Sequence, residues 1–394
     1  MSSISSAQQN IPLDLDAAIA AALQTVRRNI DAFGERYPND TTLERRYPLR
    51  HAAHGFAEGA NRGWTTSFVP GMQWLAWELT GDPTFRTAAA AHSRDFARRV
   101  RAGEDLETHD LGFLYTLASV AAWKLTGDTD AREVALLAAH HLMRRFLEPA
   151  GIIQAWGDLS DPSQRGRTII DSLMNMPLLS WAAEQTGDER FSAAVLRHAT
   201  QLREHMLRPD DSTFHTFYWD AETGAPLRGA TEQGAFDNSC WARGQAWGIY
   251  GFALNYRATG DASLLEAARR CAAYFVAHLP ADSVPYWDLV YTDGSEAPRD
   301  SSAAAIAVCG LLELADLEDD AARAEQAEGS ARRILASLVS HYAPAHSEDS
   351  DALLVHGVYD LPKDIGVDEG TLWGDYFYLE ALVRSSRRGW KPYW

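Results

Sequence analysis

Apolar residues recur at helical spacing through most of the chain, and short turns alternate with long connections between the periodic stretches. Residues three and four apart share one face of an α-helix, so this spacing predicts amphipathic helices. Strand-like fragments such as 214–219 fall inside the long connections. The pattern predicts twelve helices, over residues 14–33, 65–79, 84–103, 110–125, 129–147, 170–185, 189–207, 241–258, 262–279, 301–316, 320–342 and 371–387.

The tripeptide Thr-Gly-Asp marks the short turns. It stands at residues 80–82, 126–128, 186–188 and 259–261, each time between two apolar periodic stretches, and 316–319 is a looser fifth version. A glycine just past a helix ends it, and an aspartate caps the helix that follows. Each copy therefore predicts an antiparallel helical hairpin.

Six such hairpins place the long connections on one face. This arrangement predicts an all-α fold, an (α/α)6 barrel of six helical hairpins, which forms one domain over residues 13–394 after a flexible tail at 1–12. An open α-solenoid is the competing interpretation. Solenoid repeats are more uniform in length and have fewer long aromatic loops, so we favour the closed ring.

The acidic balance of the chain restricts its partners. Among 394 residues, 36 are basic and 54 acidic, which gives a net charge of −18. Nucleic acids and anionic membranes attract Lys/Arg clusters, and no run of 18 apolar residues occurs, so we expect neither partner. The first ten residues lack the basic and apolar regions of a signal peptide, which predicts a cytoplasmic location.

Sequence signatures for metals and cofactors are weak. The three cysteines do not form a metal knuckle, and the histidines do not have the spacing of a ligand pair on one helix face. Glycine-rich phosphate loops and the Gly-x-Ser-x-Gly nucleophile motif do not occur. We therefore expect no metal and no cofactor.

Polar and aromatic residues gather at the starts of the even-numbered helices, which all lie on the long-connection face. Asp110 and Asp171 open the fourth and sixth helices, and two carboxylates on neighbouring helices can serve as an acid/base pair in glycosidic chemistry. The chain has 13 Trp residues, several of them in polar stretches, and flat aromatic faces suit sugar rings. The pattern indicates a carbohydrate site, whereas Asp300 and Asp375 fit helix caps.

Four blocks carry a resemblance to a known family. They are His-Asp-Leu-Gly-Phe-Leu-Tyr at 109–115, Gly-Ile-Ile-Gln-Ala-Trp-Gly at 151–157, Asp-Ser-Leu-Met-Asn-Met-Pro-Leu-Leu at 171–179, and Trp-Ala-Arg-Gly-Gln-Ala-Trp-Gly-Ile-Tyr-Gly at 241–251. In these blocks the chain resembles the unsaturated glucuronyl hydrolases, glycoside hydrolase family 88, over roughly residues 14–390. The fold of that family is an (α/α)6 barrel, in agreement with the helix pattern.

The resemblance implies a function. Family members remove the 4,5-unsaturated uronic acid that polysaccharide lyases leave at the non-reducing end, by hydrating the C4=C5 vinyl ether. Asp171 matches the general acid/base, and Asp110 matches the aspartate that assists it. The expected substrate is an unsaturated uronyl di- or oligosaccharide. The positions that match the lining of the substrate pocket are His109, His215, Gln233, Trp241, Arg243, Trp247, Trp64 and Trp156.

This assignment carries electrostatic expectations. To donate a proton near neutral pH, Asp171 needs a raised pKa, and burial together with the charge of Asp110 raises it, although a helix N-terminus opposes the shift. We expect Arg243, His109 and His215 to supply the positive charge that an anionic substrate needs in an acidic protein. The net charge itself repels the substrate, so low salt should not speed binding.

Other functions stay open at this point. An unsaturated rhamnogalacturonyl hydrolase shares the ring and the chemistry, although the Ile169–Pro177 block favours the glucuronyl group. A sugar 2-epimerase needs two facing histidines, for which His109 and His215 are the plausible pair. A non-catalytic glycan binder is a third alternative.

The leaving sugar and the assembly are open as well. Glu232 adds a carboxylate that disfavours sulfated leaving sugars, and we expect the 343–369 connection to contact the leaving sugar through His356, Tyr359, Asp360 and Lys363. Glycosaminoglycan, gellan, xanthan and ulvan fragments all fit as parent polysaccharides. The chain is expected to be a monomer or a homodimer.

Overall fold

The computed structural model describes residues 13–394, and the predicted tail at 1–12 lies outside these described residues. All twelve predicted helices are found, with ends that differ by a few residues. The α-helices are α1 (Leu15–Phe33), α2 (Phe68–Thr80), α3 (Pro83–Ala102), α4 (Leu111–Tyr115), α5 (Ala121–Thr126), α6 (Thr129–Met143), α7 (Met176–Thr186), α8 (Glu189–His205), α9 (Ala242–Thr259), α10 (Ala262–Ala277), α11 (Ser301–Leu317), α12 (Ala321–Ser337) and α13 (Leu372–Ser386).

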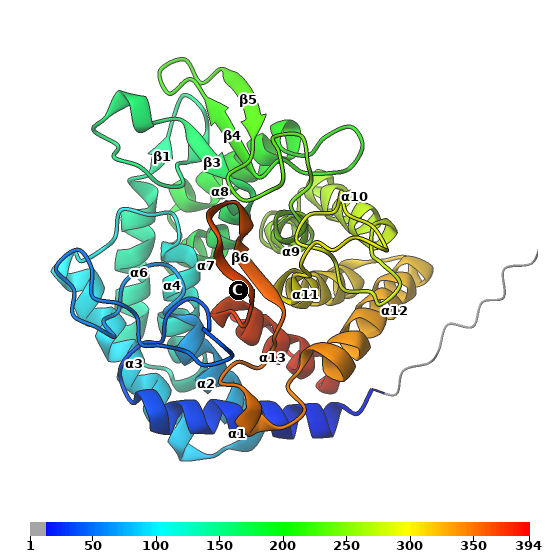
Figure 1. Cartoon of the computed structure of the whole chain (residues 1–394). Helices are drawn as coiled ribbons and strands as arrows, with labels where there is room; N and C mark the ends of the chain where they lie inside the picture. The colour runs from blue at the N-terminus through cyan, green and yellow to red at the C-terminus, as the bar shows by residue number, and fades with distance from the viewer. Residues whose placement is uncertain (1–12) are drawn as a thin grey trace, which may run out of the picture.

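The inner helices form a closed ring. Contacts run from α2 to the α4–α5 stretch, then through α7, α9, α11 and α13, and α13 packs against α2 again. The other helices lie outside this ring, and Figure 1 shows the circular arrangement along the ring axis. An open solenoid has no contact between its first and last repeats. The (α/α)6 barrel is therefore confirmed.

The Thr-Gly-Asp turns have the conformation that the sequence predicts. Their glycines have φ between 70° and 73°, the left-handed region that residues with a Cβ rarely adopt. Each aspartate then caps the next helix, as Asp82 does by accepting a hydrogen bond from the Thr84 N–H at 2.8 Å. These local signals fix eight helix ends without any help from the core.

Two inner helices are less regular than predicted. The fourth contains a π-helical segment, η1 (Thr116–Val120), between α4 and α5, and the sixth begins with a 3-10 segment, η3 (Ile170–Asn175), before α7. Here α4 and η3 pack so closely that a Cβ on Gly112 would lie only 2.2 Å from the Asn175 Cα. The Phe113 N–H donates to the Asn175 side-chain oxygen at 2.8 Å. We call this contact the Gly112–Asn175 joint.

The long connections contain short antiparallel strands. β1 (Phe146–Leu147) pairs with β2 (Ile152–Ile153), and β6 (Gly357–Asp360) pairs with β7 (Ile365–Glu369). A three-stranded sheet has the order β3 (Arg167–Ile169), β4 (Thr216–Trp219), β5 (Pro226–Ala230), which confirms the strand-like character of 214–219. In Figure 1 the β6–β7 hairpin lies across the middle of the ring.

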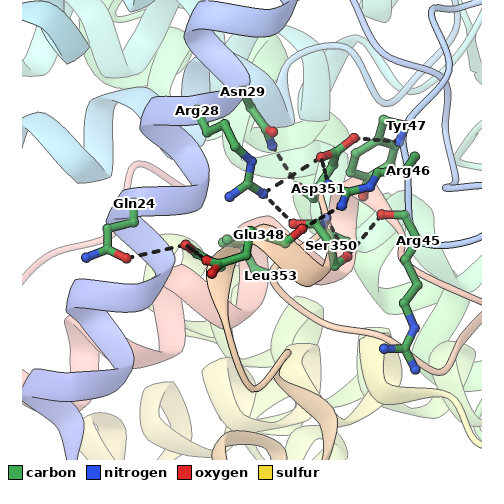
Figure 2. Close-up of polar contacts among 12 residues, drawn as sticks. Gln24, Arg28, Asn29, Arg45, Arg46, Tyr47, Glu348, Ser350, Asp351 and Leu353 are labelled. Carbon is green, nitrogen blue, oxygen red and sulfur yellow. Dashed lines mark hydrogen bonds and ion pairs between the residues drawn. The ribbon is translucent and has the colours of Figure 1, made fainter.

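Polar contacts tie the first helix to the last long connection. Asp351 accepts hydrogen bonds from Arg46 at 2.9 Å and from the Tyr47 N–H at 3.2 Å, and Asn29 on α1 donates to the Asp351 carbonyl at 2.8 Å. Figure 2 shows Arg28 reaching the same aspartate from α1. These contacts hold α1 and the 45–47 segment against residues 348–353, where the last hairpin meets the first.

The segment 390–394 packs on the ring. Trp394 stacks on Phe377 of α13 with an interplanar angle of 10°, and Tyr393 donates a hydrogen bond to Glu78 at the end of α2. Both side chains are buried. Within residues 13–394, none of the helices combines the length and the apolar character that crossing a membrane requires.

Candidate active site

A cavity of about 310 Å³ opens on the face of the ring that carries the long connections. Eight of the ten predicted site residues line it, namely Asp110, Asp171, His109, His215, Gln233, Arg243, Trp64 and Trp156. The remaining lining residues are Ala155, Ile169, Glu232, Tyr359, Asp360 and Lys363. Residues from four long connections, from the short 103–110 connection and from the starts of η3 and α9 therefore meet in one place, as the fold pattern predicts.

Trp241 and Trp247 do not line this cavity, unlike the other eight predicted site residues. Trp247 is fully buried on α9 between Phe113, at 5.4 Å, and Phe377, at 5.2 Å. Trp241 stands at the N-cap position of α9, and the centre of its ring lies 4.3 Å from the guanidinium carbon of Arg243. Both rings stand one layer behind the residues that face the cavity.

Asp171 lies in the 3-10 segment η3, directly after strand β3. The Ile170 N–H donates to the His215 carbonyl at 3.0 Å, which ties this segment to the start of β4. The Asp171 Oδ1 atom is buried and has no hydrogen-bond partner among the described residues. Burial raises the pKa of Asp171 to about 7, against the positive charge of Arg243 and with the help of Asp110. The expected direction is confirmed.

His198 holds the Asp171 segment from the outer helix α8. Its Nδ1 atom accepts a hydrogen bond from the Ile153 N–H at 2.9 Å, so the neutral ring carries its hydrogen on Nε2. Nε2 lies 2.7 Å from the Ser172 hydroxyl, which itself donates to the Ile169 carbonyl at 2.6 Å. Burial lowers the pKa of His198 to about 3, so the ring stays neutral. The sequence contains no signal for this role, because nothing local relates α8 to the Asp171 segment.

Asp110 opens α4 with its side chain partly exposed to the cavity. Thr108 donates a hydrogen bond to Asp110 Oδ2 at 2.8 Å, and the His109 Nε2 atom lies 3.3 Å from Oδ1. The His109 backbone N–H donates to the Ala155 carbonyl at 2.9 Å, which joins this loop to the Trp156 segment. The Gly112–Asn175 joint one turn later brings the segments of Asp110 and Asp171 together.

The expectation that both histidines carry positive charge is wrong. Burial lowers the pKa of His109, and burial with the nearby charges of Arg243 and Lys363 lowers the pKa of His215 to about 3. His215 Nδ1 accepts a hydrogen bond from the Glu232 N–H at 3.0 Å, so its hydrogen is on Nε2. Nε2 has no partner among the described residues, which leaves a neutral N–H donor for a ligand.

Arg243 is fixed rather than mobile. It pairs with the buried Asp300 at 3.0 Å, donates to the Tyr359 carbonyl at 2.7 Å, and lies over the Trp241 and Trp373 rings. Asp300 caps α11 as predicted, since it accepts from the Ser302 N–H at 3.1 Å. The sequence does not reveal its second role, as the ion-pair partner of Arg243, because a capping pattern involves only residues that are neighbours in the chain.

The connection before α13 forms one wall of the cavity, as expected. Tyr359 accepts hydrogen bonds from Gln233 at its carbonyl (2.7 Å) and from Trp64 at its hydroxyl (3.1 Å), and Lys363 pairs with Asp360 at 2.7 Å. His356 is different, because it pairs with Asp368 and does not line the cavity.

Asp375 is not the cap that the sequence indicated. Thr371 caps α13, whereas Asp375 is buried and accepts hydrogen bonds from the Leu353 N–H at 2.8 Å and the Tyr47 hydroxyl at 3.0 Å. Burial raises its pKa to about 8. Among residues 13–394 the structure contains no cluster of three or more His, Cys, Asp or Glu side chains that could hold a metal ion.

Comparison with known proteins agrees with this site. The family model of Glycosyl Hydrolase Family 88 matches residues 39–383. The chain is 44% identical to the unsaturated glucuronyl hydrolase of Bacillus sp. (strain GL1) over 96% of its own length and 98% of that protein. It is 43% identical to the unsaturated chondroitin disaccharide hydrolase of Streptococcus pyogenes serotype M1, over 97% and 93% of the two chains.

Solved structures give the same result. The fold matches the unsaturated glucuronyl hydrolase of Streptococcus agalactiae with a TM-score of 0.91, at 42% identity over 96% of this chain and 93% of that one. A crystal structure of an unsaturated glucuronyl hydrolase specific for heparin matches with a TM-score of 0.83 at 31% identity, over 94% and 96% of the two chains. The chain belongs to glycosyl hydrolase family 88.

Proposed function

We propose that this protein removes the 4,5-unsaturated uronic acid from the non-reducing end of lyase products by hydrating its C4=C5 double bond. The observation that carries the proposal is a carboxyl group, Asp171, whose pKa is raised to about 7 inside a cavity that also holds Asp110. A carboxyl with this pKa can donate a proton near neutral pH. The names of the relatives point to the same substrate class.

The reaction needs one proton donor and one water molecule. Asp171 transfers its proton to C4, and the electrons of the double bond form the new C–H bond while the ring oxygen shares the positive charge at C5. Water adds to C5 and returns a proton to the Asp171 carboxylate. The resulting hemiketal opens to a ketone at C5, and C1 becomes an aldehyde as it expels the leaving sugar. One water is consumed, and Asp171 ends as it began.

The remaining lining residues fit the recognition of a uronate. The neutral Nε2–H of His215 is free to donate to the substrate, and Arg243 adds a fixed positive charge. Trp64 and Trp156 present aromatic surface suited to a sugar ring. Asp110 has one carboxylate oxygen beside Thr108 and the other beside His109, so it is positioned to accept from sugar hydroxyls.

The leaving sugar is proposed from the charges at the cavity mouth. Glu232 is exposed, lines the cavity and carries no basic partner among the described residues. A carboxylate there repels a sulfate or a second carboxylate on the leaving sugar. We therefore propose an uncharged leaving sugar. The cytoplasmic location and the monomeric or dimeric state stay predictions.

The other functions are less well supported. A sugar 2-epimerase requires two histidine bases, but His215 has a low pKa, and its only free ring nitrogen carries the hydrogen. A glycan binder has no need for a buried carboxyl that stays protonated near neutral pH. A rhamnogalacturonyl hydrolase would use the same groups, so the choice of substrates in the assay separates it from the proposed activity.

The test follows the ultraviolet absorbance of an unsaturated glucuronyl disaccharide, because hydration destroys the conjugated double bond. We expect the native protein to remove the absorbance and Asp171→Asn to lose at least about a thousandfold in kcat, since it lacks the acid. Asp16→Asn makes the same change at an exposed position on α1 and serves as the control. Equal turnover by Asp171→Asn and by the native protein would indicate that Asp110, not Asp171, is the acid. Turnover of galacturonyl substrates alone supports the rhamnogalacturonyl alternative.

A further inference from the structure

Two arginines and a tyrosine form a row across the three-stranded sheet. Arg167 on β3 pairs in register with Tyr218 on β4, and Tyr218 pairs with Arg228 on β5. Directly opposite residues in antiparallel strands project from the same face of the sheet. The Arg228 guanidinium carbon lies 4.6 Å from the centre of the Tyr218 ring. We call these three residues the arginine row.

The arginine row is on the face of the sheet that borders the cavity. Ile169, two residues after Arg167 on β3, shares its face and lines the cavity. On the other face, Phe217 and Trp219 pack against His205 of α8. The row therefore continues the cavity wall outward, and two residues of strand place it about 7 Å beyond Ile169.

Two further contacts connect the row to the cavity. Arg167 lies over the ring of Trp156, a lining residue, at 5.6 Å. The Tyr218 hydroxyl is 3.4 Å from the carboxylate of Glu232, another lining residue. A substrate that extends out of the cavity past Glu232 reaches the row next.

Both guanidinium groups of the row are available to a ligand. These groups lie over the aromatic rings of Trp156 and Tyr218, and neither forms an ion pair with an acidic side chain within the described residues. Arg228 is exposed. Arg167 uses its Nε–H on the Gln164 carbonyl at 3.1 Å, which leaves its two terminal nitrogens. In a protein with a net charge of −18, two unpaired cations beside an aromatic ring are suited to an anionic sugar.

We infer that the arginine row binds the carboxylate of a second uronate, the third sugar of a longer substrate. The inference rests on the proposed function, which places the unsaturated uronate in the cavity. The order of charges along the wall then matches a chain in which charged and uncharged sugars alternate. The cavity takes the first uronate, Glu232 faces an uncharged second sugar, and the row takes the carboxylate of the third.

The test compares three substrates, an unsaturated disaccharide and two tetrasaccharides whose third sugar is either a uronate or a neutral hexose. We expect Arg228→Gln to lower kcat/KM about two- to fivefold for the uronate tetrasaccharide, the range of an exposed ion pair, and to leave the other two substrates unchanged. Arg333→Gln removes the same charge from an exposed position on α12 and is the matched control.

Equal effects of Arg228→Gln and Arg333→Gln would overturn the inference, and so would an equal loss on all three substrates. A second measurement does not depend on turnover. Calorimetry of the uronate tetrasaccharide with Asp171→Asn protein should show two- to fivefold weaker binding once Arg228→Gln is added. If the native protein leaves the disaccharide intact, the proposed function fails. The binding measurement then still shows whether the arginine row binds the carboxylate of the third sugar.

Discussion

At the residue scale, the chemistry depends on the protonation of one side chain. Burial raises the pKa of Asp171, whereas the charge of Arg243 lowers it and that of Asp110 raises it. The group therefore stays protonated far above the usual pH range of a carboxyl, and can still lose its proton near neutrality. This balance suits a residue that gives a proton to carbon and then recovers one from water.

The pH dependence of the reaction follows from this pKa. The donor is the protonated acid, so we expect kcat/KM to fall about tenfold per pH unit above a midpoint near pH 7. The measurement is a pH profile of kcat/KM on the disaccharide. Glu232→Gln, which removes a charge at the cavity mouth, should leave this midpoint in place. A midpoint below pH 5 would contradict the role of Asp171 as the acid.

Several residue properties could be predicted from sequence, and others could not. The two aspartates stand in local motifs that mark helix starts, and the lining positions were named from the family resemblance. The neutral state of His215 depends on burial and on the charges of Arg243 and Lys363, which no motif encodes. Its tautomer depends on the Glu232 N–H, seventeen residues away. Trp247 was named from its match to a pocket position of the family, and the structure buries its ring against Phe113 and Phe377.

At the element scale, the Gly112–Asn175 joint sets the relation between the two carboxylates. Asp110 begins α4, and Asp171 belongs to η3, so the spacing of these two elements determines how strongly the charges interact. Only a residue without a side chain at position 112 permits this spacing, because a Cβ would meet the Asn175 backbone. The Asn175 side chain then fixes the pair through the Phe113 N–H.

We expect Asn175→Ala to lower kcat/KM about ten- to a hundredfold, because small displacements of catalytic groups have effects of this size. The alkaline midpoint should also move to lower pH, since Asp110 would raise the pKa of Asp171 less. Both quantities come from the pH profile of the variant.

Asn29→Ala is the matched control for this variant. It removes an amide hydrogen bond between α1 and Asp351, away from the cavity lining. We expect it to lower the melting temperature by a few degrees and to leave the pH profile unchanged. Identical pH profiles for Asn175→Ala and the native protein would show that the joint is structural only.

The elements themselves were predictable to different degrees. The Thr-Gly-Asp turns end helices by local backbone and capping preferences, so their positions follow from sequence alone. The segments η1 and η3 were predicted as plain helix, because helical periodicity does not distinguish π-helical and 3-10 turns from α-helical ones. The Gly112–Asn175 joint is a tertiary contact, which helical periodicity does not report either.

At the scale of the whole molecule, the net charge of −18 opposes an anionic substrate. Salt screens this repulsion, since the Debye length falls from about 30 Å at 0.01 M to about 8 Å at 0.15 M. We therefore expect kcat/KM for the disaccharide to rise modestly over this range. The control is the methyl ester of the same uronate, which carries no charge and should show no salt dependence. A fall of kcat/KM for the free acid would indicate local attraction that outweighs the net charge.

Closure of the ring was the least certain part of the fold at the sequence level. Hairpins in a row predict a ring or a solenoid equally well, and the preference for a ring came from loop lengths. The contact of α13 with α2 and the hydrogen bond from Asn29 of α1 to the Asp351 carbonyl show that the ring is closed. These contacts join residues about 300 positions apart, a separation that no local pattern reports.

The aromatic filling of the ring axis has a consequence for the order of events. Phe113, Trp247, Phe377 and Trp394 pack against one another as a buried aromatic cluster, and Phe113 also contacts Trp64 in the cavity lining. We therefore expect substrate and products to use the same opening of the cavity. The leaving sugar, nearer the mouth, must depart first, and the keto acid beneath it must follow before a new chain end can enter. We therefore expect the keto acid to leave the cavity before each new turnover begins.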